Sequence, residues 1–192
     1  LIEQPATVNA GADQAVCSTT NSITVTGARG GSATSSTWST SGTGSFAAPS
    51  SLTTTYTFSA ADKTAGIVTL TLTTNDPAGP CLAASDGLLV TISPAATVNA
   101  GADQEICSTA ALVNLTGSIG GGASFSSWTT SGSGAFADAA NPVTTYTPSG
   151  ADITAGTVTL TLTTNNPAGP CPAASDAMVL TINRQATANA GQ

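Results

Sequence analysis

The chain has 192 residues, of which three are Lys or Arg, ten are Asp or Glu and none is His. Without histidine, Ser-His-Asp and Cys-His catalysis and His-ligated metal centres are excluded, and a net charge of −7 argues against nucleic acid and anionic membranes as partners. Charged residues make up only 7% and hydrophobic residues 40%, so we expect a folded protein with a surface of Ser and Thr, and we do not expect an enzyme.

The sequence is built on an internal repeat of ninety residues. Residues 6–95 align without a gap to residues 96–185 at about 60% identity. Residues 1–5 match the end of a repeat, and residues 186–192 restate its beginning. We therefore expect two units, at 6–95 and 96–185, from a longer array. The alternative is a mature subunit whose ends pair with neighbouring molecules.

Within each repeat the apolar residues have period two, and no stretch shows the helical period of 3.6. The expected strands of the first repeat are, in chain order, 6–11, 22–27, three strands around Trp38, Phe46 and Tyr56, then 67–75 and 88–93. In 67–75 (IVTLTLTTN) apolar residues alternate with Thr, so one face is buried and the other carries hydroxyls. No segment is predicted to insert into a membrane.

Seven short strands with a tryptophan on the third predict an immunoglobulin-like sandwich for each repeat. The fold class is therefore all-β, with two tandem seven-stranded antiparallel β-sandwiches. The aromatic residues that recur in both copies are expected in the cores, namely Trp38, Tyr56, Trp128 and Tyr146.

Four cysteines recur at the ninety-residue period: Cys17, Cys81, Cys107 and Cys171. An even number at fixed spacing predicts disulfides, and the absence of CxxC pairs argues against structural zinc. The simplest pairing, Cys17 with Cys81 and Cys107 with Cys171, joins opposite poles of an ideal sandwich, roughly 25 Å apart. A disulfide needs Cα atoms within about 7 Å. An irregular first strand, a bond between neighbouring repeats (Cys17 with Cys171) and free thiols are the alternatives left open.

Several runs resemble the PKD-like, immunoglobulin-like tandem repeats of very large bacterial surface proteins of the Bacteroidetes type. These runs are ATVNAGADQxxC, SSTWSTSGTGSF, TYTFSAADKTAGIVTLTLTTN and PAGPC, and the resemblance covers nearly the whole chain in both copies. It implies an extracellular, secreted or cell-surface-attached stalk or filament of adhesin type. Its partners would be neighbouring repeats or like subunits, and its role would be structural rather than catalytic.

Asn and Asp flank a glycine where one repeat joins the next, at Asn9, Asp13, Asn99 and Asp103. Oxygen ligands at such a junction could bind Ca²⁺, with Asn75 and Asp76 as further candidate ligands. Asn and Asp also cap turns through bonds to the backbone. No Asp-x-Asp-x-Asp-Gly run supports a metal, so we favour turn capping and expect no cofactor. Turn roles are also expected for the carboxylates that precede the last two strands of each repeat, Asp62, Asp86, Asp152 and Asp176.

A carbohydrate-binding accessory module is the competing interpretation, and it requires exposed aromatic rings. Six of the eight aromatic residues recur as equivalent pairs, which is expected of core residues. Only Phe58 and Phe125 lack an aromatic counterpart, and two isolated rings do not make a sugar platform. The rows of Ser and Thr are candidate sites for O-linked glycans.

Antiparallel sandwiches with near-identical neighbours risk pairing at their edge strands, which Lys or Pro usually prevents. Lys63 is the only lysine available, so we expect the edges to be either covered or deliberately paired. If edges pair deliberately, the end segments 1–5 or 186–192 would complete a strand in an adjacent domain or subunit. This is the filament variant of the structural interpretation.

Overall fold

The computed structural model describes residues 4–75, 82–110, 112–167 and 169–186. The chain forms two compact units: the first is Leu1–Pro94 with Gly169–Cys171, and the second is Ala95–Ala168 with Pro172–Gln192. Gly169–Cys171 belongs to the first unit, although its sequence lies in the second repeat.

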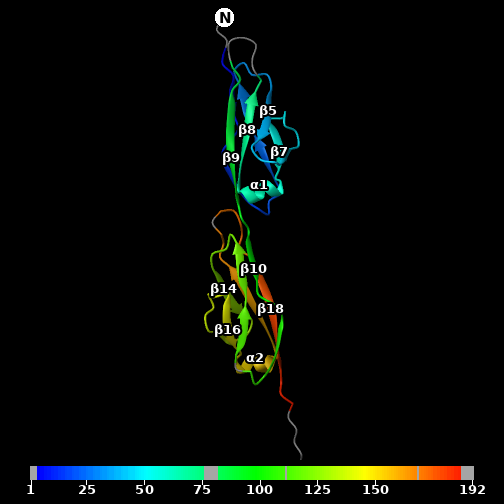
Figure 1. The fold of residues 1–192 in the computed structure, drawn as a ribbon, viewed down its shortest axis with the longest axis vertical. Helices are drawn as coiled ribbons and strands as arrows, with labels where there is room; N and C mark the ends of the chain where they lie inside the picture. Colours follow the sequence, from blue (N-terminus) through cyan, green and yellow to red (C-terminus); the bar gives the residue numbers. More distant parts are fainter. Residues whose placement is uncertain (1–3, 76–81, 111, 168, 187–192) are drawn as a thin grey trace, which may run out of the picture. The chain divides into compact units, whose positions relative to one another are not determined.

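Each repeat contains the same order of elements (Figure 1). In the first they are β1 (Thr7–Asn9), β2 (Gln14–Cys17), β3 (Ser22–Thr26), β4 (Ala28–Gly30), β5 (Ser36–Thr40), β6 (Ser45–Phe46), β7 (Thr53–Thr57), α1 (Ala60–Ala65), β8 (Ile67–Thr74) and β9 (Ser85–Ser93). In the second they are β10 (Ala96–Asn99), β11 (Gln104–Cys107), β12 (Val113–Thr116), β13 (Ser118–Gly121), β14 (Ser126–Thr130), β15 (Ala135–Phe136), β16 (Val143–Thr147), α2 (Gly150–Ala155), β17 (Thr157–Thr164) and β18 (Ser175–Asn183).

Two sheets and one short pair of strands make up each unit. In the first repeat a four-stranded sheet has the order β2-β9-β8-β5, a three-stranded sheet has the order β3-β7-β6, and β1 pairs with β4. The second repeat has the same arrangement, β11-β18-β17-β14, β12-β16-β15 and β10-β13. The predicted pair of immunoglobulin-like sandwiches is confirmed.

The structure refines this prediction in two ways. The first two strands of each sandwich are each split in two, so that in the first repeat β1 and β4 pair with each other, whereas β2 joins the four-stranded sheet and β3 the three-stranded sheet. The first break contains Gly11 with φ +97°, a left-handed conformation that favours glycine. In addition, β2 pairs with β9, and β11 with β18, in parallel, whereas the other described strand pairs are antiparallel.

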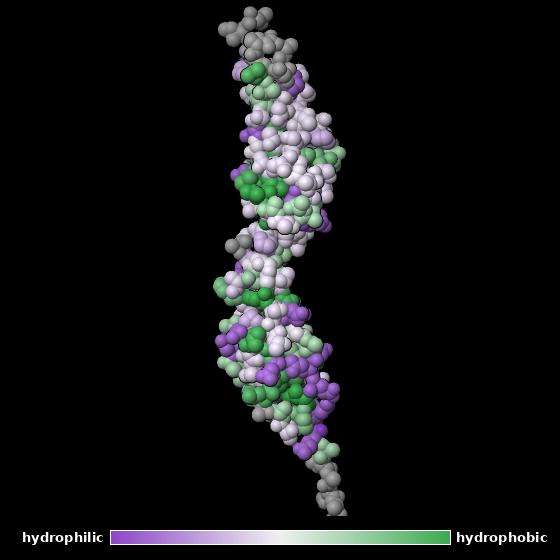
Figure 2. Space-filling view, in the orientation of Figure 1, coloured by the Kyte–Doolittle hydropathy of each residue, from purple (hydrophilic) through white to green (hydrophobic). Residues whose placement is uncertain are grey.

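The alternation read from the sequence sets the core of each sandwich. Along β8, Val68, Leu70 and Leu72 are buried, and the Thr residues between them are only partly buried. Trp38 and Tyr56 are buried in the same cluster, and Trp128 and Tyr146 are their buried counterparts. Figure 2 shows a surface that is largely pale, of intermediate hydropathy, with strongly polar and hydrophobic residues scattered over both units.

The short helices α1 and α2 were not expected, because six residues are too few to show a helical period. Ser59 caps the start of α1 in a capping box with Asp62, and Gly66 ends it with φ +76°. α2 has the equivalent caps, Ser149, Asp152 and Gly156. In the described ranges, no helix has the length and apolar character needed to cross a membrane.

Candidate functional site

The main covalent feature of the first unit is a disulfide between Cys17 and Cys171. Their Cα atoms lie 4.8 Å apart, and 154 residues of sequence separate them. Both side chains are buried, with 5% and 1% of their surface exposed. The bond therefore closes a covalent loop that contains most of the chain.

Local backbone structure holds each cysteine in place. Cys17 ends β2, opposite Ser93 in the parallel pairing with β9. The chain then turns, with Ser18 N–H donating to Ser93 O and Thr20 N–H to Cys17 O, both at 2.8 Å. On the other side Gly169 has φ +107°, and a Cβ at this position would lie 2.7 Å from Ser93 Oγ. Glycine is required there because the segment approaches Ser93 closely in a left-handed conformation.

This bond corrects the simplest pairing expected from the sequence. Cys17 pairs with Cys171 and not with Cys81, and Cys107 is a free, exposed thiol rather than the partner of Cys171. The pairing between repeats, one of the alternatives left open, is the one present. The physical reason is reach: a disulfide requires close Cα atoms, which residues at opposite poles of one sandwich do not have. Cys81 lies outside the described residues.

Cys107 has a polar environment that favours its thiolate. Thr109 Oγ1 donates a hydrogen bond to Cys107 Sγ at 3.3 Å. Hydrogen bonds from the side chain and backbone of Thr109 are the largest causes that lower the pKa of the Cys107 thiol from its usual value. A lowered pKa raises the fraction of the nucleophilic thiolate at neutral pH.

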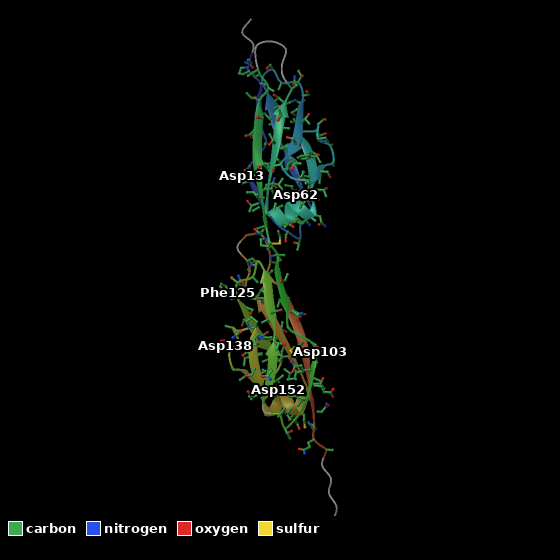
Figure 3. All side chains as sticks on the ribbon, viewed as in Figure 1. Asp13, Asp62, Asp103, Phe125, Asp138 and Asp152 are labelled. Atoms are coloured by element: carbon green, nitrogen blue, oxygen red, sulfur yellow. A yellow bond between two sulfur atoms is a disulfide. The ribbon has the colours of Figure 1, made fainter. Side chains whose placement is uncertain are left out.

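A second feature recurs in both units: a buried aspartate that organises the loop between the fifth and sixth strands. Asp62 is 2% exposed and lies in the first turn of α1, and Asp152 lies in the first turn of α2 (Figure 3). Its Oδ1 accepts from Thr43 N–H (2.8 Å). Its Oδ2 accepts from Gly44 N–H (3.0 Å), Ser59 N–H (3.1 Å) and Tyr56 Oη–H (2.8 Å).

These donors set the charge state of Asp62. Burial alone raises the pKa of its carboxyl, but the backbone N–H groups of Thr43 and Ser59 and the Tyr56 hydroxyl outweigh it, so the pKa is lowered. Burial and the adjacent carboxylate raise the pKa of Tyr56. Asp152 and Tyr146 behave in the same way. The site is a fixed carboxylate with all its hydrogen bonds inside the fold, which suits a structural role.

The sequence predicted only turn roles for Asp62 and Asp152, so this organising role is a correction. Two signals were available. Ser59 and Asp62 have capping-box spacing, and the Ser-Gly-x-Gly runs at 41–44 and 131–134 recur in both repeats. A Cβ on Gly42 would lie 2.3 Å from Asp62 Oδ1, which explains why this loop needs glycine.

The four candidate calcium ligands each accept a backbone hydrogen bond. Asn9 Oδ1 accepts from Gly11 N–H and Asn99 Oδ1 from Gly101 N–H, both at 2.7 Å. Asp13 Oδ1 accepts from Leu89 N–H and Asp103 Oδ1 from Val179 N–H, both at 2.8 Å. Among the described residues, no three His, Cys, Asp or Glu side chains gather in one group.

The neighbouring polar residues are engaged in the same way. Asn75 Oδ1 accepts from the N–H groups of Thr34 and Ser35, and Asp76 lies outside the described residues. Asp86 and Asp176 lie within β9 and β18 rather than in turns. Their Oδ2 atoms accept from the N–H groups of Ala10 and Ala100 at 2.8 Å, and so hold the broken first strand of each sandwich.

The two unmatched aromatic residues do not form one surface. Phe58 is buried in the first core, where it packs edge-on against Tyr56. Phe125 is 66% exposed in the second unit and is labelled in Figure 3. A sugar-binding platform requires more than a single exposed ring.

Comparison with known proteins identifies the fold. No protein-family model and no curated protein matches the chain. Similar solved structures include titin domains I67–I69 (TM-score 0.51, 13% identity, 96% of this chain and 67% of that chain). They also include Sidekick-1 immunoglobulin domains 1–4 (0.55, 10%, 94% and 49%) and the insect immune protein hemolin (0.56, 9%, 91% and 46%). The chain spans about half the length of the last two. At such low identity the likeness establishes the fold, and the two units are immunoglobulin-like.

Proposed function

We propose that this chain is a non-catalytic, tension-carrying segment of a secreted bacterial surface stalk or filament. In this proposal residues 6–95 and 96–185 are adhesin-type, PKD-like spacer repeats of a longer array, and residues 1–5 and 186–192 belong to the flanking repeats. The observation that carries the proposal is the disulfide between Cys17 and Cys171, because it shortens the covalent path between the two ends of the chain.

The force path follows from chain connectivity alone. A force applied at the two ends is transmitted from Cys17 to Cys171 through the disulfide. The residues between them lie in a closed covalent loop, so they do not extend under this force. The segments outside the loop, 1–16 and 172–192, extend together to at most about 130 Å. Without the bond the whole chain would extend to about 670 Å. The disulfide therefore suits a protein that must keep its length under tension.

The surface chemistry supports an extracellular location. Structural disulfides persist in oxidising surroundings outside the cell. The three Lys and Arg residues leave few sites for trypsin-like proteases, and Ser and Thr keep the surface polar without charge. Neighbouring repeats or like subunits are the partners that this role requires, and O-linked glycans on Ser and Thr would add further protection.

Single-molecule pulling between the two ends tests the tension-carrying role. In oxidising buffer we expect the contour length gained before detachment to stay below about 130 Å. Reduction, or the Cys17→Ser Cys171→Ser double variant, should release about 500 Å more, because the loop residues then enter the force path. Cys107→Ser is the matched control and should behave as the unaltered chain does. A gain of several hundred Å in the oxidised chain would contradict the proposal.

Electron microscopy of intact cells, labelled with antibodies against the chain, tests the location and the form of the assembly. Labelled single threads are expected of a stalk, and regular helical fibres of a filament. Labelling that appears only after the cells are made permeable would rule out a surface role.

A further inference from the structure

Cys107 occupies in the second repeat the position that Cys17 has in the first. Cys17 ends β2 opposite Ser93 of β9, and Cys107 ends β11 opposite Asn183 of β18, in the same parallel register. The ninety-residue period thus places a second cysteine on an equivalent strand.

The backbone around the two cysteines is also the same. Ser108 N–H donates to Asn183 O at 2.8 Å, as Ser18 N–H donates to Ser93 O at 2.8 Å. Ala110 N–H donates to Cys107 O at 2.9 Å, as Thr20 N–H donates to Cys17 O at 2.8 Å. The strand end and the turn that present Cys17 to its partner are therefore already formed at Cys107.

The two positions differ in what covers them. Cys17 is bonded to Cys171, which follows a Pro-Ala-Gly-Pro sequence, and is buried. Cys107 is exposed, and its sulfur is a free thiol. The first unit thus shows the disulfide that a cysteine at this strand end forms, and in the second unit the equivalent cysteine is a thiol.

We propose that Cys107 is a covalent attachment site for the cysteine of a Pro-Ala-Gly-Pro-Cys loop from another copy of this repeat, joined head to tail. The inference rests on the proposed function, since it extends the bond between Cys17 and Cys171 to the next junction of an array. In a solution of this chain the attached segment comes from a second copy, through Cys81, the other cysteine in a Pro-Ala-Gly-Pro-Cys sequence. That segment is identified by its sequence alone, because residues 76–81 lie outside the described part of the structure.

The bond forms by thiol–disulfide exchange with a small disulfide such as oxidised glutathione. The Cys107 thiolate attacks one glutathione sulfur, the disulfide bond of glutathione breaks, and one glutathione thiolate leaves. The loop thiolate then attacks Cys107 Sγ in the mixed disulfide and displaces the second glutathione. Two protein thiols are oxidised, and one glutathione disulfide is reduced to two glutathione thiols. The hydrogen bond from Thr109 assists the first step because it stabilises the attacking thiolate.

The test is to incubate the purified chain, with its Cys17–Cys171 bond formed, in a buffer of oxidised and reduced glutathione at rising protein concentration. Non-reducing electrophoresis should show a ladder of covalent oligomers. Peptide mapping should find Cys107 joined to Cys81. Cys107→Ser and Cys81→Ser should each remove every band above the monomer, and an equimolar mixture of the two variants should form a dimer but no longer species.

Three results would overturn the inference. In the first, the chain stays monomeric at the highest protein concentration, with Cys107 as a thiol or a glutathione adduct. In the second, peptide mapping finds a symmetric bond between two Cys107 residues. In the third, Cys81→Ser forms a dimer by itself. Each is separate from the pulling experiment, which depends only on Cys17 and Cys171. If the oxidised chain keeps its length in the pulling experiment but forms no covalent oligomers, the proposed function stands and the attachment site is rejected.

Discussion

At the residue scale, the buried carboxylates Asp62 and Asp152 explain why the two sandwiches have the same loops. Four donors from three separate segments converge on Asp62: the loop after β5, the cap of α1 and Tyr56 of β7. A buried charge is costly unless hydrogen bonds satisfy it, and here they do. The carboxylate therefore joins the two sheets of the sandwich at a point where apolar packing ends.

Asp62→Asn should destabilise the first unit by about 3 kcal/mol, because an amide NH₂ would replace an oxygen that accepts hydrogen bonds and would leave donors unsatisfied. Asp13→Asn is the matched control, since exposed Asp13 accepts the Leu89 N–H and an amide oxygen can do the same, so its effect should be small. Denaturant-dependent hydrogen exchange at β8 and β17 reads the two units separately. An equal loss of stability of the first unit in Asp62→Asn and Asp13→Asn would contradict the role of Asp62.

The same carboxyl makes stability depend on pH. Its folded-state pKa lies below the ordinary value of 3.8, so it contributes stability above that pH and loses this contribution as the pH falls through the folded-state pKa. The free energy of unfolding should fall more steeply below about pH 4 in the unaltered chain than in Asp62→Asn. Urea unfolding from pH 7 to pH 2 measures both curves.

At the element scale, glycines decide where the second strand of each sandwich breaks. Between β3 and β4, a Cβ on Gly27 would lie 2.3 Å from Leu72 Cδ2 and 3.0 Å from Asn9 O. At the equivalent Gly117, a Cβ would lie 2.7 Å from Leu162 Cδ2 and 2.9 Å from Trp128 Cζ2. The strand must pass close to the core at this point, and glycine is the residue that permits it.

Gly27→Ala should destabilise the first unit by about 1–3 kcal/mol, because the added methyl overlaps a fully buried leucine in a close-packed core. Gly87→Ala is the matched control: its nearest contact would be Thr69 Cγ2 at 3.3 Å, and the second repeat carries Ala177 there. We expect it to change stability by less than about 0.5 kcal/mol. Thermal and urea unfolding measure the difference, and similar values for the two variants would show that the contact is relieved without cost.

At the scale of the whole molecule, one disulfide joins Cys17 of the first repeat to Cys171, a residue of the second repeat. The segment Gly169–Cys171 belongs to the first unit, so that unit is incomplete without residues encoded in the second repeat. A bond that closes a loop of this size stabilises chiefly by restricting the unfolded chain.

The Cys17→Ser Cys171→Ser variant should therefore lower the free energy of unfolding by about 2–5 kcal/mol. Hydrogen exchange should show the loss at β2 and β9 of the first unit, because Cys17 ends β2 opposite Ser93 of β9. Cys107→Ser is the control, because it changes an exposed thiol that makes no disulfide, and reduction of the unaltered chain should reproduce the double variant. Unchanged protection of β2 and β9 would contradict a stabilising role and would mean that the bond only tethers the chain.

Local patterns in the sequence were enough to determine the fold class. The alternation of Val68, Leu70 and Leu72 with Thr specifies a strand with one buried face, because side chains on a strand alternate between its faces. Trp38 and Tyr56 have aromatic counterparts in the second copy, which predicted them as core residues, and both are buried. Only the tertiary structure decided which groups meet across long stretches of chain. The donors to Asp62 lie up to 19 residues away, and Cys17 and Cys171 are 154 residues apart. Periodicity reports which way a side chain faces, but the distance between two such residues depends on how the strands are placed in space.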